Sequence, residues 1–356
     1  MPIGFCVRLA ASIFGCLLLS AASLAAAQES VEQFYKSKQI AMIVGSSAGG
    51  GYDTYARLLA RHFTSAMPGN PTVVVQNMSG AGSNRAAGYI YSVAPKDGTA
   101  TAAIFPGAVL QPLLSDVPVP HDPNKLIYLG SANSDVYVCY VRTDAAVKTF
   151  KDVLNKELII GASNPGATTY DLALVLNSVL GAKFRIVTGY PGSREITLAL
   201  ERGEVQGACG IGWTGIEMMY PDWFAKDTVR VLVQLSTKGH PDLNRRGVPR
   251  AGEFAREEDD RRVIELVFSQ GLFGRPYVLP PGVPPERVEA LRKAFLQTLN
   301  DKNLRAEADK MQLDVDPMTG DELQKLVAEL YATPPRLIER ARLALAAKPL
   351  AGKPQR

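Results

Sequence analysis

Two hydrophobic periods alternate along most of the chain. Short apolar runs bounded by glycine, proline or asparagine predict strands. They occupy residues 39–44, 72–76, 99–104, 126–129, 137–141, 158–160, 184–188 and 229–235. Between them, apolar residues recur every three or four positions, as they do from Tyr55 to Ala66, and this spacing predicts amphipathic helices. The alternation of strands and helices is typical of an α/β architecture with parallel sheets.

The last part of the chain is predicted to be mostly helical. Residues 280–285 read Pro-Pro-Gly-Val-Pro-Pro and form a rigid connector. The helix that follows carries its apolar side chains from 288 to 299 on one face. Two further helices are expected at 321–331 and 336–347, and the segment 348–356 is expected to fray.

Three predicted strands each lead into a glycine-rich loop and then into a helix. These loops span residues 45–51, 77–84 and 161–168. The first N–H groups of a helix have no partner within it, and the helix dipole is positive there, so such loops are suited to bind anions. Several of them on one chain predict a protein that captures a carboxylate. Asp53, just after the first loop, either caps its helix or accepts a hydrogen bond from a ligand or water, and both interpretations stay open.

Residues 1–27 have the pattern of a secretory signal peptide. Arg8 supplies the positive charge, an apolar stretch follows, and Ala25-Ala26-Ala27 fit a small-residue cleavage site. We therefore expect a periplasmic protein that is cleaved near Ala27. A lipid anchor on Cys16 is the weaker alternative, because Phe14 is bulky beside that cleavage point.

Composition and charge exclude several classes of partner. The chain has 39 Lys and Arg against 35 Asp and Glu, and they are spread rather than clustered, which argues against nucleic acid and anionic membrane surfaces. His62, His121 and His240 stand in no metal-ligand spacing, so we expect neither a metal nor another cofactor. Cys139 and Cys209 remain after export; they form either one disulfide or two buried thiols, and the sequence does not decide between these.

Two enzyme motifs are matched only formally. Residues 45–49 fit the G-x-S-x-G pattern of a hydrolase with Ser47 as nucleophile, but His240 is the only far-downstream histidine and no second motif completes a triad. A dinucleotide-binding loop would need a third glycine where Thr54 stands, and an acidic residue within 69–74. We therefore expect a protein that is not an enzyme, with a Ser47 hydrolase as the minor alternative.

Five segments, in the same order, resemble the motifs of tripartite tricarboxylate transporter receptors, the Bug-type extracytoplasmic solute-binding proteins. They are residues 48–59, 77–84, 94–99, 161–167 and 274–284. The chain departs from that family at Ser46-Ser47-Ala48, where the family has a proline before the glycines. It departs again at residues 188–192, where Pro191 replaces the lysine of the family's Val-Pro-Tyr-Lys-Gly.

The resemblance implies a two-domain clamshell of the type II-like periplasmic-binding-protein class, each domain a mostly parallel sheet flanked by helices. Domain 1 would comprise residues 28–132 and 236–356, the latter with the C-terminal helices, and domain 2 residues 133–235. Such a receptor captures a small carboxylate in the cleft and delivers it to the membrane permease of a tripartite tricarboxylate-type transporter. We expect a monomer, and a sensor subunit for a signalling partner is the alternative.

The resemblance also implies the ligand contacts, mostly backbone N–H groups and hydroxyls. Domain 1 would offer Ser47, Gly49, Gly50, Asp53, Gly80, Ala81 and Ser83. Domain 2 would offer Ser163, Gly166, Thr168, Thr169, Tyr190, Ser193 and Glu195. Tyr52, Phe105 and Trp213 could stack on an aromatic acid, although each is more typical of a core or a cleft wall.

Overall fold

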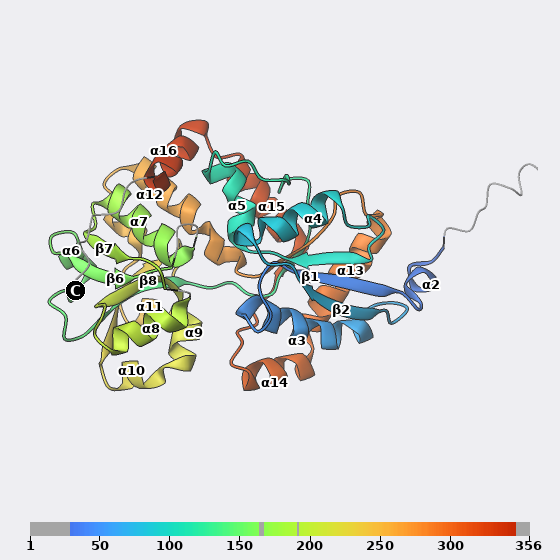
Figure 1. Cartoon of the computed structure of the whole chain (residues 1–356), viewed down its shortest axis with the longest axis horizontal. Helices are drawn as coiled ribbons and strands as arrows, with labels where there is room; N and C mark the ends of the chain where they lie inside the picture. Colours follow the sequence, from blue (N-terminus) through green and yellow to red (C-terminus); the bar gives the residue numbers. More distant parts are fainter. Residues whose placement is uncertain (1–28, 164–166, 191, 347–356) are drawn as a thin grey trace, which may run out of the picture.

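The computed structural model describes residues 29–163, 167–190 and 192–346, except for the side chains of Met218 and Met219. The predicted signal peptide, Gly166, Pro191 and the end of the chain lie outside the described residues. Two domains lie side by side along the long axis of the molecule (Figure 1). Each has a central sheet with helices on both faces.

The first domain is built on a six-stranded sheet with the order β11-β4-β10-β3-β1-β2. Its strands are β1 (Gln39–Val44), β2 (Thr72–Asn77), β3 (Ala100–Ala103), β4 (Ile127–Ser131), β10 (Pro276–Leu279) and β11 (Met318–Thr319). Its helices are α2 (Val31–Tyr35), α3 (Gly51–Ala66), η1 (Ala81–Ser83), α4 (Asn84–Ser92), α5 (Pro106–Leu114), α13 (Pro285–Asn300), α14 (Lys302–Lys310) and α15 (Gly320–Tyr331).

Strand β1 shows why this sheet is covered on both faces. Successive side chains of a strand point to opposite faces, and all positions from Met42 to Val44 are buried. Ile40, Met42 and Val44 pack with α3 and α13, whereas Ile43 packs with α4 and α5 on the other face. A strand that is apolar on both faces belongs inside an α/β sheet, as the sequence predicts.

The second domain is built on a five-stranded sheet with the order β7-β6-β8-β5-β9. Its strands are β5 (Tyr137–Arg142), β6 (Leu158–Gly161), β7 (Phe184–Val187), β8 (Gly207–Gly212) and β9 (Val229–Leu235). Its helices are α6 (Phe150–Val153), α7 (Thr168–Leu180), α8 (Ser193–Glu201), α9 (Trp213–Met219), α10 (Pro221–Ala225), α11 (Pro241–Arg245), η2 (Ala251–Phe254) and α12 (Glu258–Phe268).

The two sheets share one topology. Leaving aside the short β11, the orders β2-β1-β3-β10-β4 and β7-β6-β8-β5-β9 correspond strand for strand. In each, the strand in fourth place runs antiparallel to its neighbours, and the other four run in one direction. This is the two-domain α/β fold that the sequence predicts.

The chain crosses between the domains twice, and the two crossing segments are hydrogen-bonded to each other. The first crossing lies between β4 and β5, close to the expected position near 133. The second runs through η3 (Ser269–Phe273) into β10. The N–H of Asp135 donates to Gly271 O at 2.8 Å, and the N–H of Gly274 donates to Asn133 O at 3.0 Å. These bonds define a hinge of residues 132–136 and 269–275.

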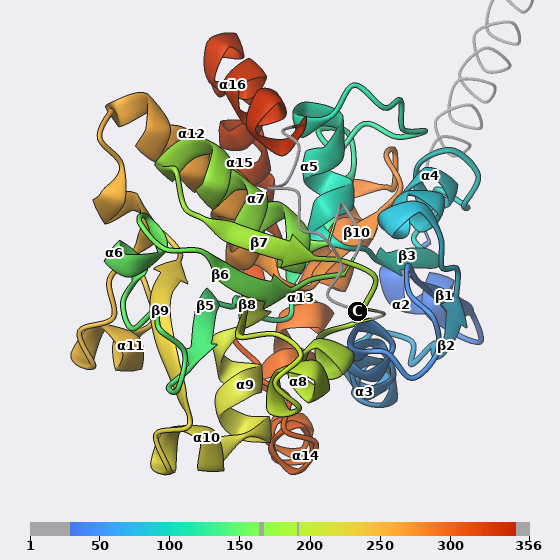
Figure 2. The same cartoon turned by 60° about the vertical axis from the view of Figure 1, so that its left-hand side comes forward.

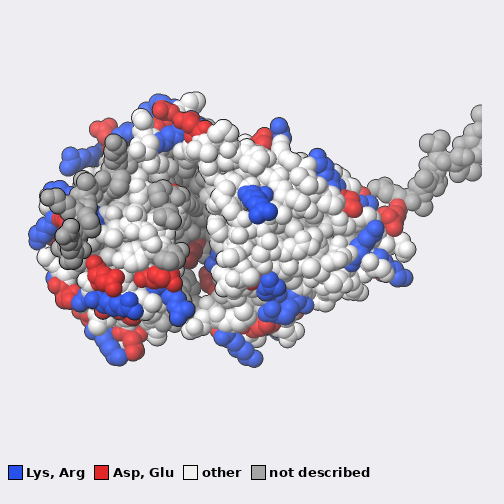
Figure 3. All heavy atoms as spheres, viewed as in Figure 1, with Lys and Arg blue, Asp and Glu red and all other residues white. Residues whose placement is uncertain are grey.

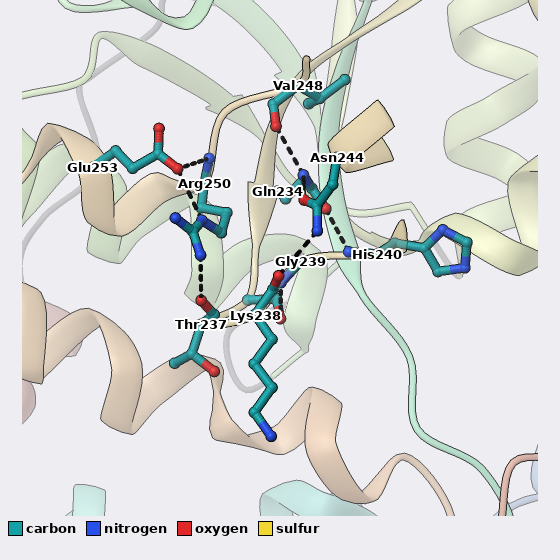
Figure 4. A network of polar contacts seen from close by, with 10 residues as sticks. Gln234, Thr237, Lys238, Gly239, His240, Asn244, Val248, Arg250 and Glu253 are labelled. Carbon is teal, nitrogen blue, oxygen red and sulfur yellow. Dashed lines mark hydrogen bonds and ion pairs between the residues drawn. The ribbon is translucent and has the colours of Figure 1, made fainter. Parts of the chain in front are cut away.

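The second crossing lies later than the predicted position near 236. Gln234 is fully buried, and its amide nitrogen donates to Asn244 Oδ1 at 2.9 Å and to Val248 O at 2.8 Å (Figure 4). Its amide oxygen accepts the N–H of His240 at 2.7 Å. This network holds the segment after β9 on the second domain, and α12 then packs on α7. The position near 236 had been implied by the family resemblance alone.

Helix α16 (Pro335–Ala346) joins the domains on one side of the molecule. It packs against α12 and α7 of the second domain and against α5 of the first (Figure 2). Arg336 and Arg340 of α16 form ion pairs with Asp259 and Asp260 of α12. Helix α16 therefore fixes one side of the interdomain region.

The structure decides the open question about the cysteines. Strands β5 and β8 are neighbours, and their register places Cys139 directly opposite Cys209. The two side chains are fully buried and form a disulfide across 70 residues of sequence. The bridge therefore ties the strand that enters the second domain to the middle of its sheet.

Candidate functional site

A cleft separates the two domains on the face shown in Figure 3. Strand β1 runs from α2 toward the second domain, so its carboxyl end points at the cleft (Figure 1). Strand β2 pairs with it in register from Gln39 and Thr72 to Val44 and Asn77, so both strands end at one edge. In open α/β sheets, ligands bind at the carboxyl ends of the parallel strands. The glycine loops after β1 and β2 lie at this edge.

The carboxylate of Asp53 holds the first loop in shape through hydrogen bonds. It accepts the N–H of Gly49 at 2.8 Å, the Nε–H of Arg57 at 2.9 Å and the amide of Asn77 at 2.8 Å. The residue is only 2% exposed. Gly49 has φ +78°, a conformation that glycine adopts without strain. Asp53 therefore shapes the loop that carries Ser47 and Gly50, and three protein groups occupy its oxygens.

The same contacts make Asp53 a source of acid sensitivity. The hydrogen bond from Arg57, helped by those from Gly49 and Asn77, lowers the pKa of this carboxyl to about 2. A depressed pKa contributes stability above the unfolded value near 3.8, and this stability is lost as the pH falls toward 2. We expect Asp53→Asn to cost about 2 kcal/mol at neutral pH and to flatten the fall between pH 4 and pH 2. Urea unfolding of the wild type and of Asp53→Asn between pH 4 and pH 2 measures this loss of stability. Equal acid sensitivity of the two proteins would contradict the prediction.

The second loop carries a run of left-handed backbone. Gly80, Ala81, Gly82 and Ser83 all have positive φ, with values of 133°, 48°, 60° and 76°. Positive φ at Ala81 and Ser83 costs energy and is found where surrounding contacts or function require it. Ser83 is 1% exposed, and its hydroxyl oxygen has no hydrogen-bond partner in the described structure. An unsatisfied buried hydroxyl at the start of α4 marks a place where a water or ligand oxygen would fit.

The first two loops are packed against each other through a glycine. A Cβ built on Gly45 would lie 1.7 Å from Oγ of Ser83 and 2.8 Å from its Cβ. Any side chain at Gly45 would therefore push the second loop away from the first. This contact sets the spacing of the two glycine loops.

The second domain places its loops at the carboxyl ends of β6 and β7. The hydroxyl of Thr169 accepts the N–H of Ser163 at 3.0 Å, and that of Thr168 donates to Gly210 O at 2.7 Å. These bonds fix the start of α7. The ring of Tyr190 lies beside the missing side chain of Gly161, with a ring carbon 3.2 Å from the position of its Cβ.

The predicted site residues thus fall into two groups. Exposed or partly exposed at the loops are Ser47, Gly49, Gly50, Gly80, Ala81, Ser163, Thr168, Tyr190, Ser193 and Glu195. Buried beneath them and holding the loops in shape are Asp53, Ser83 and Thr169. Ser193 and Glu195 lie at the start of α8. Contact of either group with a ligand stays a prediction.

The hinge contains polar residues that the sequence did not single out. Three side-chain atoms there are buried without a hydrogen-bond partner in the described structure: Asn133 Oδ1, Asp135 Oδ1 and Arg275 Nε. The guanidinium of Arg275 lies 4.3 Å from the ring centre of Tyr52. A Cβ on Gly212 would overlap the Asp135 carboxylate, so this group fits only beside glycine. The only sequence signal for this group was the family-like segment 274–284, which contains Arg275. Asp135 stands in an ordinary polar segment and gave no signal.

Asp135 makes the hinge sensitive to pH. Burial, together with the charge of Asp314, raises the pKa of its carboxyl to about 7, against the lowering effect of Arg275. A raised pKa destabilises the fold as the pH rises from the unfolded value near 3.8 through 7. We expect Asp135→Asn to be more stable than the wild type at pH 8 and equal to it near pH 4. Thermal melts of both proteins measure this difference; a difference that does not change with pH would contradict it.

The three histidines have other partners than Ser47. The ring of His62 contacts Glu307 at 2.8 Å, and the ring of His121 contacts Ala108 O at 2.8 Å. His240 Nδ1 accepts the N–H of Asp242 at 3.2 Å, and its ring points away from the Gln234 network (Figure 4). Within the described residues, no group of three or more His, Cys, Asp or Glu side chains could hold a metal ion. In the same part of the chain, no helix has the length and apolarity to cross a bilayer.

Solved structures with the same fold are periplasmic binding proteins. A TctC solute-binding protein from Polaromonas superposes with a TM-score of 0.65 at 22% identity, over 86% of this chain and 99% of its own. MatC from Rhodopseudomonas palustris, solved with bound malate, gives 0.59 at 19% identity over 86% and 99%. R. palustris Rpa4515, solved with adipate, gives 0.61 at 19% identity over 85% and 97%. The chain thus has the two-domain fold of TctC-type solute-binding proteins.

Sequence comparison adds one relative and no family assignment. The UPF0065 protein in the TAR-I ttuE-ttuC' intergenic region of Agrobacterium vitis is 28% identical over 216 residues. The match covers 56% of this chain and 58% of the relative, so it spans little more than half of that protein. No protein-family model matches the chain.

Proposed function

We propose that this protein is a periplasmic receptor that captures a small carboxylate in the interdomain cleft. The observation that carries the proposal is the pair of glycine loops at the carboxyl ends of β1 and β2, held at fixed spacing by Gly45 and Ser83. Both lead into helix N-termini, where unpaired N–H groups bind anions. Ser83, with its unsatisfied hydroxyl, adds one more polar contact at the same edge.

The similar structures support the choice of a carboxylate. MatC was solved with malate and Rpa4515 with adipate, and both share the fold of this chain. Backbone donors and bridging waters can hold a carboxylate without a cation in contact. Delivery of the acid to the permease of a tripartite tricarboxylate-type transporter, after export and cleavage near Ala27, follows from the motif resemblance and completes the proposal.

A binding role also fits the surroundings of Ser47 better than catalysis does. Ser47 is exposed, and its carbonyl accepts the N–H of Gly50 at 3.4 Å. The histidine rings contact Glu307, Ala108 and Asp242 instead. A serine hydrolase needs a histidine within hydrogen-bond reach of the nucleophile. We therefore propose that the protein is not an enzyme.

A thermal-shift screen of the exported protein tests the proposal. The panel contains mono-, di- and tricarboxylates, aromatic acids and amino acids. A ligand at 100-fold over its dissociation constant should add about 2.7 kcal/mol to the free energy of unfolding. A raised melting temperature with one class of acid is the expected result. No shift with any acid, or ester turnover that Ser47→Ala abolishes, would overturn the proposal.

A further inference from the structure

Arg275 lies in the hinge, where the two domains meet. It directly precedes β10, whose first residue pairs with Ser131 at the carboxyl end of β4. The N–H of Arg275 donates to Ser131 Oγ at 3.1 Å, and its carbonyl accepts the N–H of Ala132 at 3.0 Å. Its backbone is therefore fixed at the same edge of the sheet as the glycine loops.

The charge of this arginine has no acidic partner. No carboxylate of the described residues lies within 4 Å of its nitrogens, and Nε is buried without a hydrogen-bond partner. The rings of Tyr52 and Tyr55 lie against it instead, with their centres 4.3 Å and 4.5 Å from the guanidinium. Stacking uses the faces of a guanidinium, whereas its N–H donors lie in the plane. The two rings hold the group in place, and Nε keeps donor capacity for an acceptor.

A second positive feature lies beside it. A Cβ built on Gly51 would stand 3.2 Å from Nη2 of Arg275, and Gly51 is the exposed first residue of α3. A cation at a helix N-terminus is unfavourable, because the dipole is positive at that end. An anion placed between the two would remove this repulsion. Asp135 does not supply the anion fully, since burial raises the pKa of its carboxyl to about 7.

We propose that the guanidinium of Arg275, beside Gly51, holds the second carboxylate of a dicarboxylate ligand where the two domains meet. This inference rests on the proposed function, in which the glycine loops hold the first carboxylate. Arginine suits this task because its donors bind a carboxylate through two parallel hydrogen bonds. The favoured ligand is then an aliphatic dicarboxylate rather than a monocarboxylate of the same length.

The test compares matched acids on matched variants. Protein exported to the periplasm is titrated by calorimetry with succinate and butyrate, glutarate and pentanoate, and adipate and hexanoate. The wild type should bind at least one dicarboxylate roughly tenfold or more tightly than its monocarboxylate partner, a difference of one charged contact. Arg275→Gln should weaken the dicarboxylate by a similar factor and leave the monocarboxylate almost unchanged. Arg287→Gln is the control. Arg287 lies on α13, outside the hinge, and its guanidinium also lies over a ring, 3.5 Å from the ring centre of Phe34.

Each outcome decides the matter. Equal affinity of the wild type for both members of every pair overturns the inference, even if Arg275→Gln does not fold. Equal weakening of both members by Arg275→Gln, or the same loss in Arg287→Gln, overturns the role of Arg275 and leaves the receptor proposal intact. No binding of any of these six acids by the wild type overturns this inference, and the receptor proposal falls with it only if the wider thermal-shift panel also gives no shift.

Discussion

Removal of the Cys139–Cys209 disulfide should destabilise the protein by about 4 kcal/mol, because the bond closes a loop of 70 residues in the unfolded chain. We expect a Cys139→Ala/Cys209→Ala variant to unfold at a clearly lower urea concentration than the wild type. Both side chains are fully buried, so the small loss of packing adds to the effect. The loop contains β6, α7, β7 and α8, so the lost stability concerns the whole second domain.

Unfolding with and without a reducing agent separates the stability that comes from the disulfide from the stability that comes from side-chain packing. Once the chain unfolds, the reductant opens the disulfide, so the reduced wild type should approach the double variant. Alkylation of the denatured wild type, followed by mass measurement, should find Cys139 and Cys209 unmodified. Two alkylated thiols in the exported protein, or a double variant as stable as the oxidised wild type, would show that the bridge does not form.

Much of the fold could be predicted because its signals are local. The strands at Gln39–Val44 and Val229–Leu235 have the bounds that the apolar runs predict. Strand β8 was expected only as a strand-like segment around Cys209, without bounds, since Gly207–Gly212 contains three glycines and has no apolar run. Glycine is needed there for packing rather than for strand formation: a Cβ on Gly210 would lie 2.1 Å from the carbonyl of Thr168. No pattern along one strand reports such a contact with another element.

The domain boundary shows the same limit. Both crossings were expected from the family resemblance alone, near residues 133 and 236. The chain passes back to the first domain only through η3 and β10, later than the resemblance implies. One side chain of the segment after β9 and two of its backbone groups are partners of Gln234, the buried amide of β9. A single polar position in a strand gives no sign of the loop that satisfies it.

For the site, the sequence pointed to the loops but did not show which of their residues are buried and hold the loop in shape. Asp53 was left open between capping and ligand contact, and the structure shows its oxygens bonded to Gly49, Arg57 and Asn77. Arg275 was noticed only as part of a motif. Its significance comes from Tyr52 and Tyr55 on α3, more than two hundred residues away in sequence. Only the assembled sheet brings the return strand to the loops that precede it.

The largest effect on ligand binding should come from Gly45→Ala. The new Cβ would stand 1.7 Å from Oγ and 2.8 Å from Cβ of Ser83, so rotation of the hydroxyl alone cannot relieve the overlap. Ser83 is buried and already in the left-handed region, so it has little room to move. Overpacking of this kind costs about 1–3 kcal/mol. We expect the two loops to separate and the affinity for the ligand acid to fall at least roughly tenfold.

Calorimetric titration of three variants isolates this contact. Gly107→Ala is the matched control, because a Cβ there meets nothing within 4 Å, and it should bind as the wild type does. Gly45→Ala/Ser83→Gly should recover much of the lost affinity, since glycine removes both overlapping atoms and adopts the φ of 76° without strain. Unchanged binding in Gly45→Ala would mean that loop spacing does not control the site. A loss that Ser83→Gly fails to rescue would place its cause outside this contact, and the geometry that carries the receptor proposal would then have no role in binding.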